Sequence, residues 1–256
     1  MSDLKIALFQ TVQFWEDKME NLKHFEVQLK GLATDTDILI FPEMFHTGFT
    51  MSVKEMAEPM DGLGVQWLTK MAAKYDCAIV ASLIIVEEGN YYNRMVFIEP
   101  SGAVNFYDKR KLFTLAKEDN YFSPGKQNTI VSYKGWKLLL QVCYDLRFPE
   151  LARNKVQHEN FDYDVLLYVA NWPKKRASHW QALLRARAIE NQCYVAAVNR
   201  VGKDANELDY SGNSSIIDAL GNILAETIDK ETITYHVLQK SELHQVREKL
   251  PFLKDQ

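Results

Sequence analysis

Short apolar runs of strand length recur along the whole chain. The runs are 5–9, 37–41, 78–86, 94–99, 137–143, 164–170, 194–199, 214–219 and 232–238. They are rich in Val, Ile, Leu and Ala, which indicates strands that are buried on both faces.

Helical patterns separate several of these runs, at 16–32, 64–75 and 178–192. Strands that alternate with helices are typical of an α/β fold. The segments 86–93 and 218–222 have the composition of hairpin turns between consecutive strands. We therefore expect mixed sheets, which makes a TIM barrel a poor fit.

The segment 178–192 carries apolar residues at helical spacing. Its first residue, Ser178, is of a type that commonly caps a helix N-terminus. The residues predicted to share its apolar face are Trp180, Leu183, Leu184 and Ile189. No linker, repeat or low-complexity tract interrupts the chain. Residues 1–256 are thus predicted to form a single domain with a helical tail from about 240.

Composition narrows the class of partner. Of 256 residues, 47% are hydrophobic, and 30 Lys and Arg against 34 Asp and Glu give a net charge of -4. This balance argues against binding to nucleic acid or to an anionic membrane surface. No run approaches the roughly 20 apolar residues that span a bilayer, and the N-terminus lacks a signal-peptide pattern. We expect a cytoplasmic protein whose partner is a small molecule or another copy of the chain.

Three cysteines, an odd number without close pairs, are expected to be reduced thiols. Cys77 and Cys193 precede apolar runs and are interpreted as buried structural residues. Cys143 instead ends the run 137–143, and polar residues follow it at once. Ligands of open α/β proteins bind beyond the carboxyl ends of strands. Cys143 is therefore either a buried apolar residue or a nucleophile activated by its neighbours.

A carboxylate follows another strand in a similar way. Glu43 comes after the run 37–41 and lies between Phe41 and Phe45. It is either a solvated loop residue or a partly desolvated carboxylate that is suited to general-base work near neutral pH.

The segment 105–125 adds two charged candidates, Lys109 and Glu118. Ordinary surface roles are the alternative for both residues. Together with Glu43 and Cys143, they would supply a base, a nucleophile, a cation for an oxyanion and a carboxylate that holds the cation.

A cysteine protease arrangement would instead need an imidazole. His46 and His179 lie nearest to predicted strand ends, but neither has a local catalytic signature. The basic run at 173–176 is interpreted as a solvated loop. The chain has neither a glycine-rich phosphate loop nor His, Cys and Asp at metal-ligand spacing. We expect neither a cofactor nor a metal.

Three successive segments resemble the motifs of the nitrilase superfamily, the carbon–nitrogen hydrolases with a Glu-Lys-Cys site. They are "FPEMF" with Glu43, "YDKRKLF" with Lys109 and "VCYDLRFPEL" with Cys143. The similarity extends to 171–173, 179–202 and 210–224. Within the superfamily the sequence is most similar to the bacterial ω-amidases, which hydrolyse the side-chain amide of 2-oxo acids such as 2-oxoglutaramate and 2-oxosuccinamate.

The resemblance implies a four-layer α-β-β-α sandwich of two mixed sheets, and a homodimer or larger homo-oligomer. It implies an amide hydrolase with Cys143 as nucleophile and Glu43 as general base. Lys109 and the backbone N–H of Tyr144 would stabilise the oxyanion. Glu118 would position Lys109 and the substrate.

The carboxylate of a 2-oxo acid needs a cationic or amide partner. Arg147, Arg200 and Lys174 are available, although Arg147 is alternatively a structural residue paired with Glu150. Further candidates for substrate contact, with core packing as the alternative, are Phe45, Tyr121, Tyr144, Asn171 and Trp172.

Two other interpretations stay open. The same fold could act on a carbamoyl amino acid, a nitrile or another small amide. It could also be a catalytically silent binding protein, against which all four chemical positions are present.

Overall fold

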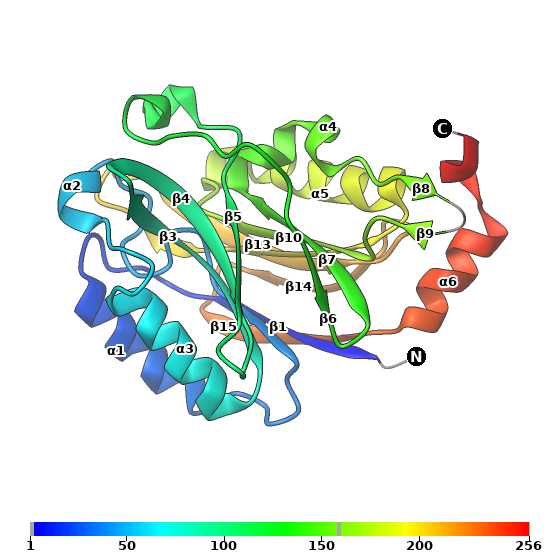
Figure 1. Ribbon diagram of the computed structural model, residues 1–256, viewed down its shortest axis with the longest axis horizontal. Helices are drawn as coiled ribbons and strands as arrows, with labels where there is room; N and C mark the ends of the chain where they lie inside the picture. Colours follow the sequence, from blue (N-terminus) through cyan, green and yellow to red (C-terminus); the bar gives the residue numbers. More distant parts are fainter. Residues whose placement is uncertain (1–2, 158–159, 256) are drawn as a thin grey trace.

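The computed structural model describes residues 3–157 and 160–255. Its secondary structure forms four layers, with two β-sheets face to face and a helical layer outside each sheet (Figure 1). Helices α1 (Lys18–Leu29) and α3 (Leu63–Tyr75) cover one sheet, and α5 (Ala177–Asn191) covers the other. The predicted α-β-β-α sandwich of two mixed sheets is confirmed.

The first sheet lies against α1 and α3. Neighbouring strands β1, β2 and β3 are parallel, and the other pairings are antiparallel. The strand order is β15 (Thr232–Leu238), β1 (Leu4–Gln10), β2 (Ile38–Ile40), β3 (Ala78–Glu87), β4 (Asn90–Ile98) and β5 (Val104–Asp108).

The second sheet lies against α5, and its parallel strands are β7, β10 and β11. The order is β12 (Val201–Lys203), β13 (Asp209–Ile217), β11 (Tyr194–Asn199), β10 (Val165–Ala170), β7 (Trp136–Val142) and β6 (Ile130–Tyr133), with β14 (Ile223–Ile228) paired to β13. Shorter elements are α2 (Val53–Met56), η1 (Thr114–Ala116), η2 (Glu118–Asn120), η3 (Cys143–Arg147), α4 (Pro149–Ala152), β8 (Val156–Gln157), β9 (Asn160–Phe161), η4 (Lys174–Arg176), α6 (Lys240–Lys249) and η5 (Phe252–Asp255).

Burial on both faces explains the continuous apolar runs. In β1, Ile6 and Leu8 belong to the core between the sheets, whereas Ala7 and Phe9 belong to the core beneath α1 and α3. Successive side chains of a strand point to opposite faces, so a strand with apolar neighbours on both sides has no polar face. A helix-covered sheet therefore produces the pattern seen in the sequence.

Both predicted hairpins are present. The β3–β4 turn has positive φ at Glu88 and Gly89, and the β13–β14 turn has positive φ at Gly221. Cys77 and Cys193 are buried free thiols just ahead of β3 and β11, as predicted. Within the described residues, no helix combines the length and the apolar character needed to cross a membrane.

Two details of the helix predicted at 178–192 are wrong. The N-cap position of α5 is Arg176, and Ser178 lies in the first turn because η4 leads directly into the helix. Ile189 is 52% exposed. The buried stripe runs at four-residue intervals through Trp180, Leu184 and Ala188, so the next residue is rotated away from the sheet.

Candidate active site

Four strands deliver polar residues to one edge of the sandwich. Glu43 follows β2 and Lys109 follows β5, and these two strands run in the same direction. Cys143 and Asn171 follow the parallel strands β7 and β10 of the other sheet. The backbone N–H of Asn171 donates to Glu43 Oε2 at 2.8 Å. The carboxyl ends of strands from both sheets therefore meet at this site.

A buried ionic cluster forms the floor of the site. Lys109 Nζ lies 2.9 Å from Glu43 Oε1, and 3.0 and 2.9 Å from Oε1 and Oε2 of Glu118. Each of the three side chains has 0% exposure. Asn93 of β4 donates from Nδ2 to both glutamates. The structure thus brings together the base, the cation and the second carboxylate predicted from the sequence.

The carboxylates determine the charge of the lysine. Burial alone lowers the pKa of Lys109, but Glu118 and Glu43 outweigh it and hold that pKa above its usual value. The pKa of Glu118 is raised, chiefly by burial and also by the charge of Glu43. Lys109 is therefore a permanent cation at neutral pH, fixed before any substrate charge develops.

Cys143 lies at the turn directly after β7. Its φ of 44° is in the left-handed region, which is uncommon for a non-glycine residue, and it is the first residue of η3. Its Sγ lies 4.0 Å from the carbonyl oxygen of Asn171. Burial, reinforced by the charge of Glu43, holds the thiol pKa well above its ordinary value. Cys143 is thus a thiol at neutral pH, and a base must take its proton during attack.

Asp145 holds this turn in place. Its Oδ2 accepts hydrogen bonds from the Val142 backbone N–H at 3.0 Å and the Tyr107 hydroxyl at 2.8 Å, and its Oδ1 accepts from the Lys111 backbone N–H at 2.9 Å. Burial raises the pKa of Asp145 to about 6. The carboxylate therefore ties the turn after β7 to the segment that carries Lys109.

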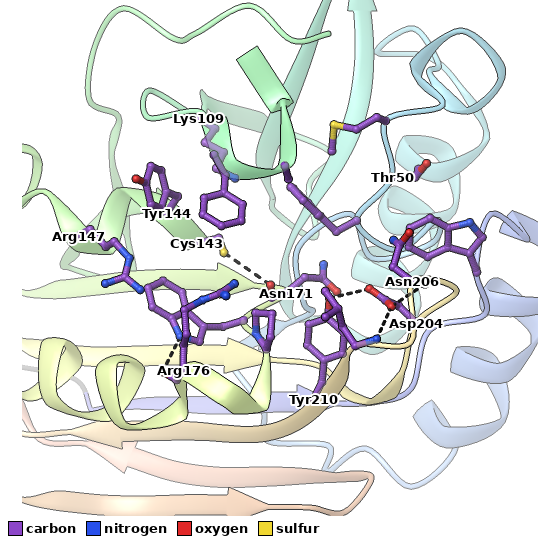
Figure 2. A pocket seen from close by; sticks show the side chains of 18 residues that line it. Thr50, Lys109, Cys143, Tyr144, Arg147, Asn171, Arg176, Asp204, Asn206 and Tyr210 are labelled. Carbon is purple, nitrogen blue, oxygen red and sulfur yellow. Dashed lines mark hydrogen bonds between the residues drawn. The ribbon is translucent and has the colours of Figure 1, made fainter. Parts of the chain in front are cut away.

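A cavity of about 370 Å³ opens over Cys143 and Lys109 (Figure 2). Its aromatic walls come from Trp15, Phe49, Phe113, Tyr144, Trp172 and Tyr210. Two half-buried arginines, Arg147 and Arg176, lie toward one end in this view, and Asp204 and Asn206 lie toward the other. This combination suits a small polar molecule with an apolar middle.

Only some of the residues predicted to contact the substrate line the cavity. Tyr144, Asn171 and Trp172 line the cavity, as does Arg147. Phe45 lies elsewhere, in the core beneath α1 and α3. The chain reverses at Met44, whose φ is 44°, and so directs the next side chain away from Glu43.

Tyr121 does not line the cavity either. It is the C-cap residue of η2 and is 46% exposed. The same short helix turns its first residue, Glu118, inward to Lys109. Side chains three residues apart would lie on the same side of an ideal 3₁₀ helix. Tyr121 lies beyond the end of η2, with a φ of -120° and a ψ of -31°, so its side chain does not follow that of Glu118.

Two of the three basic residues predicted to bind the substrate carboxylate, Arg200 and Lys174, do not line the cavity. The guanidinium of Arg200 is buried and donates to backbone carbonyls, and Lys174 pairs with Asp229 outside the cavity. Glu150 contacts Lys111. The alternative pairing of Glu150 with Arg147 is therefore wrong.

Arg147 instead packs over the ring of Trp172, with 4.7 Å from Cζ to the ring centroid, and its Nη2 lies 3.3 Å from His179 Nδ1. Arg176 packs over Phe113. Neither guanidinium forms an ion pair with a carboxylate among the described residues. The sequence prediction interpreted the basic run at 173–176 as a solvated loop. It therefore did not identify Arg176 as a residue that lines the cavity.

The two candidate imidazoles lie away from the thiol. His46 Nε2 is 3.1 Å from Glu58 Oε2 in the core, where burial lowers the pKa of the ring, and His179 contacts Arg147. In the described part of the chain, no imidazole is a hydrogen-bond partner of Cys143. Among those same residues, no group of three or more His, Cys, Asp or Glu side chains is placed to hold a metal ion.

The sequence prediction missed Asn93 and Asp145. Asn93 lies inside an apolar strand, in "YYNRMVFI", with 1% exposure. A polar residue in the interior of a buried strand must find a partner, and this was the available signal. Asp145 lies two residues after Cys143, and its role depends on three donors from separate segments, which local sequence does not show.

Comparison with known proteins places the chain in a family. Residues 5–248 match the family model for carbon-nitrogen hydrolase. The chain is 44% identical to the ω-amidase YafV of Escherichia coli strain K12 over 257 residues, which cover 100% of this chain and 97% of that protein. It is 36% identical to the 2-oxoglutaramate amidase of Bacillus subtilis, with 92% and 91% covered.

A solved structure agrees. XC1258 from Xanthomonas campestris, a CN-hydrolase superfamily protein with an arsenic adduct in the active site, has a TM-score of 0.97 to this structure at 41% identity. The match covers 100% of this chain and 98% of that one. The chain belongs to the carbon-nitrogen hydrolase family. The superfamily resemblance found in the sequence is thereby confirmed.

We predict that Asp145→Asn destabilises the protein by about 1–3 kcal/mol at pH 7, because an amide N–H would replace one acceptor oxygen and face a buried donor. Tyr107→Phe removes one donor to the same carboxylate and should cost about 0.5–1.5 kcal/mol. Urea unfolding monitored by circular dichroism measures both. An Asp145→Asn variant with an unchanged free energy of unfolding would contradict the proposal that Asp145 fixes the turn.

Proposed function

We propose that the protein hydrolyses the side-chain amide of small 2-oxo acid amides, 2-oxoglutaramate and 2-oxosuccinamate, to the 2-oxo diacid and ammonia. The observation that carries the proposal is the buried Glu43–Lys109–Glu118 cluster beside the Cys143 thiol, at the floor of a cavity with two arginines free of carboxylate partners among the described residues. Two relatives, named as an ω-amidase and a 2-oxoglutaramate amidase, support the same substrate.

The first half of the reaction forms a thioester. Glu43 takes the thiol proton as Cys143 Sγ attacks the amide carbonyl carbon, and the carbonyl π electrons move to oxygen. The Lys109 ammonium and the backbone N–H of Tyr144 hold the oxyanion. Its collapse breaks the C–N bond, and the nitrogen leaves as ammonia with the proton from Glu43.

The second half releases the acid. Glu43 takes a proton from water as its oxygen attacks the thioester carbonyl, and the same donors hold the second oxyanion. The C–S bond then breaks and the sulfur recovers its proton from Glu43. Glu118 fixes Lys109 through both carboxylate oxygens throughout the cycle.

In this proposal, the two arginines of the cavity bind the carboxylate end of the substrate. A guanidinium binds a carboxylate through two parallel N–H donors. Arg147 and Arg176 are each supported by an aromatic face, Trp172 and Phe113 respectively. We assign the 1-carboxylate of the 2-oxo acid to this pair, with the amide end directed to Cys143.

A homodimer or larger homo-oligomer forms part of the proposal. Ile189 of α5 and Leu220 of the β13–β14 turn are both about half exposed. The turn lies against Ile189, because a Cβ added at Gly221 would be only 2.7 Å from Ile189 Cδ1. Exposed apolar side chains that lie next to one another are typical of a surface that another chain covers.

We predict that Cys143→Ala and Glu43→Gln each lower kcat for 2-oxoglutaramate by at least 10³-fold, because one removes the nucleophile and the other the base. Glu43→Gln keeps the size of the side chain. Ammonia release in steady state is the measurement. His179→Ala is the control: it removes a contact to Arg147 and can raise KM, but its kcat should stay within a few-fold of that of the unaltered protein. Loss of turnover in His179→Ala with turnover retained in Glu43→Gln would overturn the mechanism.

The substrate class is tested with a panel. We expect kcat/KM for 2-oxoglutaramate and 2-oxosuccinamate to exceed that for a carbamoyl amino acid, an aliphatic nitrile and a neutral amide such as butyramide. Brief exposure to the substrate should add an acyl mass to the peptide that contains Cys143. If the keto-amides rank among the poorest substrates, the assignment fails. No adduct and no turnover on any compound would favour a silent binding protein.

We predict that Arg176→Met lowers kcat/KM for 2-oxoglutaramate about 10- to 100-fold, mainly through a higher KM, because a charge-assisted hydrogen bond to the carboxylate is lost. Lys174→Met is the matched control, because Lys174 is two residues away and pairs with Asp229 outside the cavity. Turnover of butyramide, which has no carboxylate, should change little in either variant. Equal losses on both substrates would contradict the assignment of Arg176.

A further inference from the structure

Asn93 contacts every charged member of the cluster. Its Nδ2 donates to Glu43 Oε1 at 2.8 Å and to Glu118 Oε1 at 3.2 Å. Its backbone carbonyl accepts from the Lys109 backbone N–H at 3.0 Å. One asparagine in the middle of β4 thus joins the two glutamates and fixes the start of the segment that carries the lysine.

The orientation of this amide follows from its surroundings. Asn93 Oδ1 has no hydrogen-bond partner among the described residues. If the amide were flipped, that oxygen would face two carboxylates, and both amide hydrogens would lose charged acceptors. The Nδ2 group therefore lies between the glutamates.

Two buried carboxylates that share a donor repel each other, and such a pair ordinarily takes up a proton. Lys109 can neutralise one negative charge of the pair. The amide adds no charge, but its Nδ2 group occupies one acceptor position on each carboxylate.

The contacts also distinguish the two oxygens of Glu43. Oε1 already accepts from Lys109 Nζ and Asn93 Nδ2, whereas Oε2 accepts from the Asn171 backbone N–H. A carboxylate oxygen has two lone pairs in its plane. The position with remaining capacity is therefore on Oε2, and Asn93 blocks a proton from the position between the glutamates.

We propose that Asn93 is a positioning residue that keeps Glu43 and Glu118 as two separate carboxylates and reserves Oε2 of Glu43 for the proton of Cys143. The inference rests on the proposed function, since it assigns the base of that reaction. It adds a residue that acts through Glu43 and contacts no substrate.

The test is the acid limb of the pH profile. In Asn93→Leu, which keeps the branching of the side chain at Cγ and removes the donor, the acid limb of kcat/KM should move up by about one pH unit or more. At pH values above that limb, kcat should fall less than it does in Glu43→Gln. Asn93→Ala serves as the second variant if the larger side chain prevents folding, and melting temperatures confirm the fold.

Asn154 provides a matched control. It is as buried as Asn93, and its Nδ2 donates to the backbone carbonyls of Tyr163 and Asn191. Asn154→Ala should lower the melting temperature and leave the acid limb in place. If both Asn93 variants lose activity equally at all pH values, or if Asn154→Ala moves the limb as far, the proposal is wrong.

A second readout separates this proposal from the substrate assignment. Alkylation of Cys143 by iodoacetamide, measured by peptide mass spectrometry across pH, also requires removal of the thiol proton. Its acid limb should move up in the Asn93 variants. Absence of turnover on every amide, together with this shift, would reject the substrate and support Asn93. Turnover with an unmoved limb in both measurements would reject Asn93 alone.

Discussion

The ammonium of Lys109 lies between two glutamates that have no exposed surface. Taking each of these ions out of water costs several kcal/mol, and only close contacts with opposite charge and hydrogen-bond donors offset that cost. Removing the lysine would leave two uncompensated carboxylates in the core. The arrangement of strands around the site can be understood as the scaffold that keeps both carboxylates within 3.0 Å of the ammonium.

The scaffold works because its parts come from separate strands of both sheets. Glu43 and Cys143 follow strands that end in buried residues, and Lys109 follows β5, which is paired with β4 along its whole length, so their backbones have little freedom to shift. Asp145 joins two of these strand ends directly, through three donors. Because the sandwich is rigidly packed, the side chains at its edge are held in accurate positions. A reaction that uses several charged groups requires this accuracy.

Strand periodicity and the rule that ligands bind at the carboxyl ends of strands were enough to predict an α/β fold with mixed sheets, both hairpins and the neighbourhood of Glu43 and Cys143. Motif resemblance was needed to predict the four layers and to choose a catalytic over a surface role for Lys109 and Glu118, because charged residues in a loop carry no local signal of burial. The failures have a common cause. Phe45 lies two residues after Glu43 in sequence, yet a left-handed residue between them sends it to another core.

Residues whose role depends on a distant partner were also beyond sequence patterns. Arg176 is embedded in a basic run, and nothing local indicates that its side chain packs on Phe113. Strands β5, β6, β12 and β14 were missed because exposed and polar positions interrupt their apolar patterns. These strands are stabilised by pairing with strands that are distant in the sequence. A window of neighbouring residues does not contain that information.

The high thiol pKa of Cys143 has a consequence for the resting protein. Peroxides and other oxidants react with thiolates, and low-pKa exposed cysteines are the ones that pass to sulfenic acid. Here the proton stays on sulfur until Glu43 removes it, and only 9% of the residue is exposed at the floor of the cavity. The nucleophile is thus kept in a form that resists oxidative damage between turnovers, and its reactivity depends on the arrival of an electrophile beside the base.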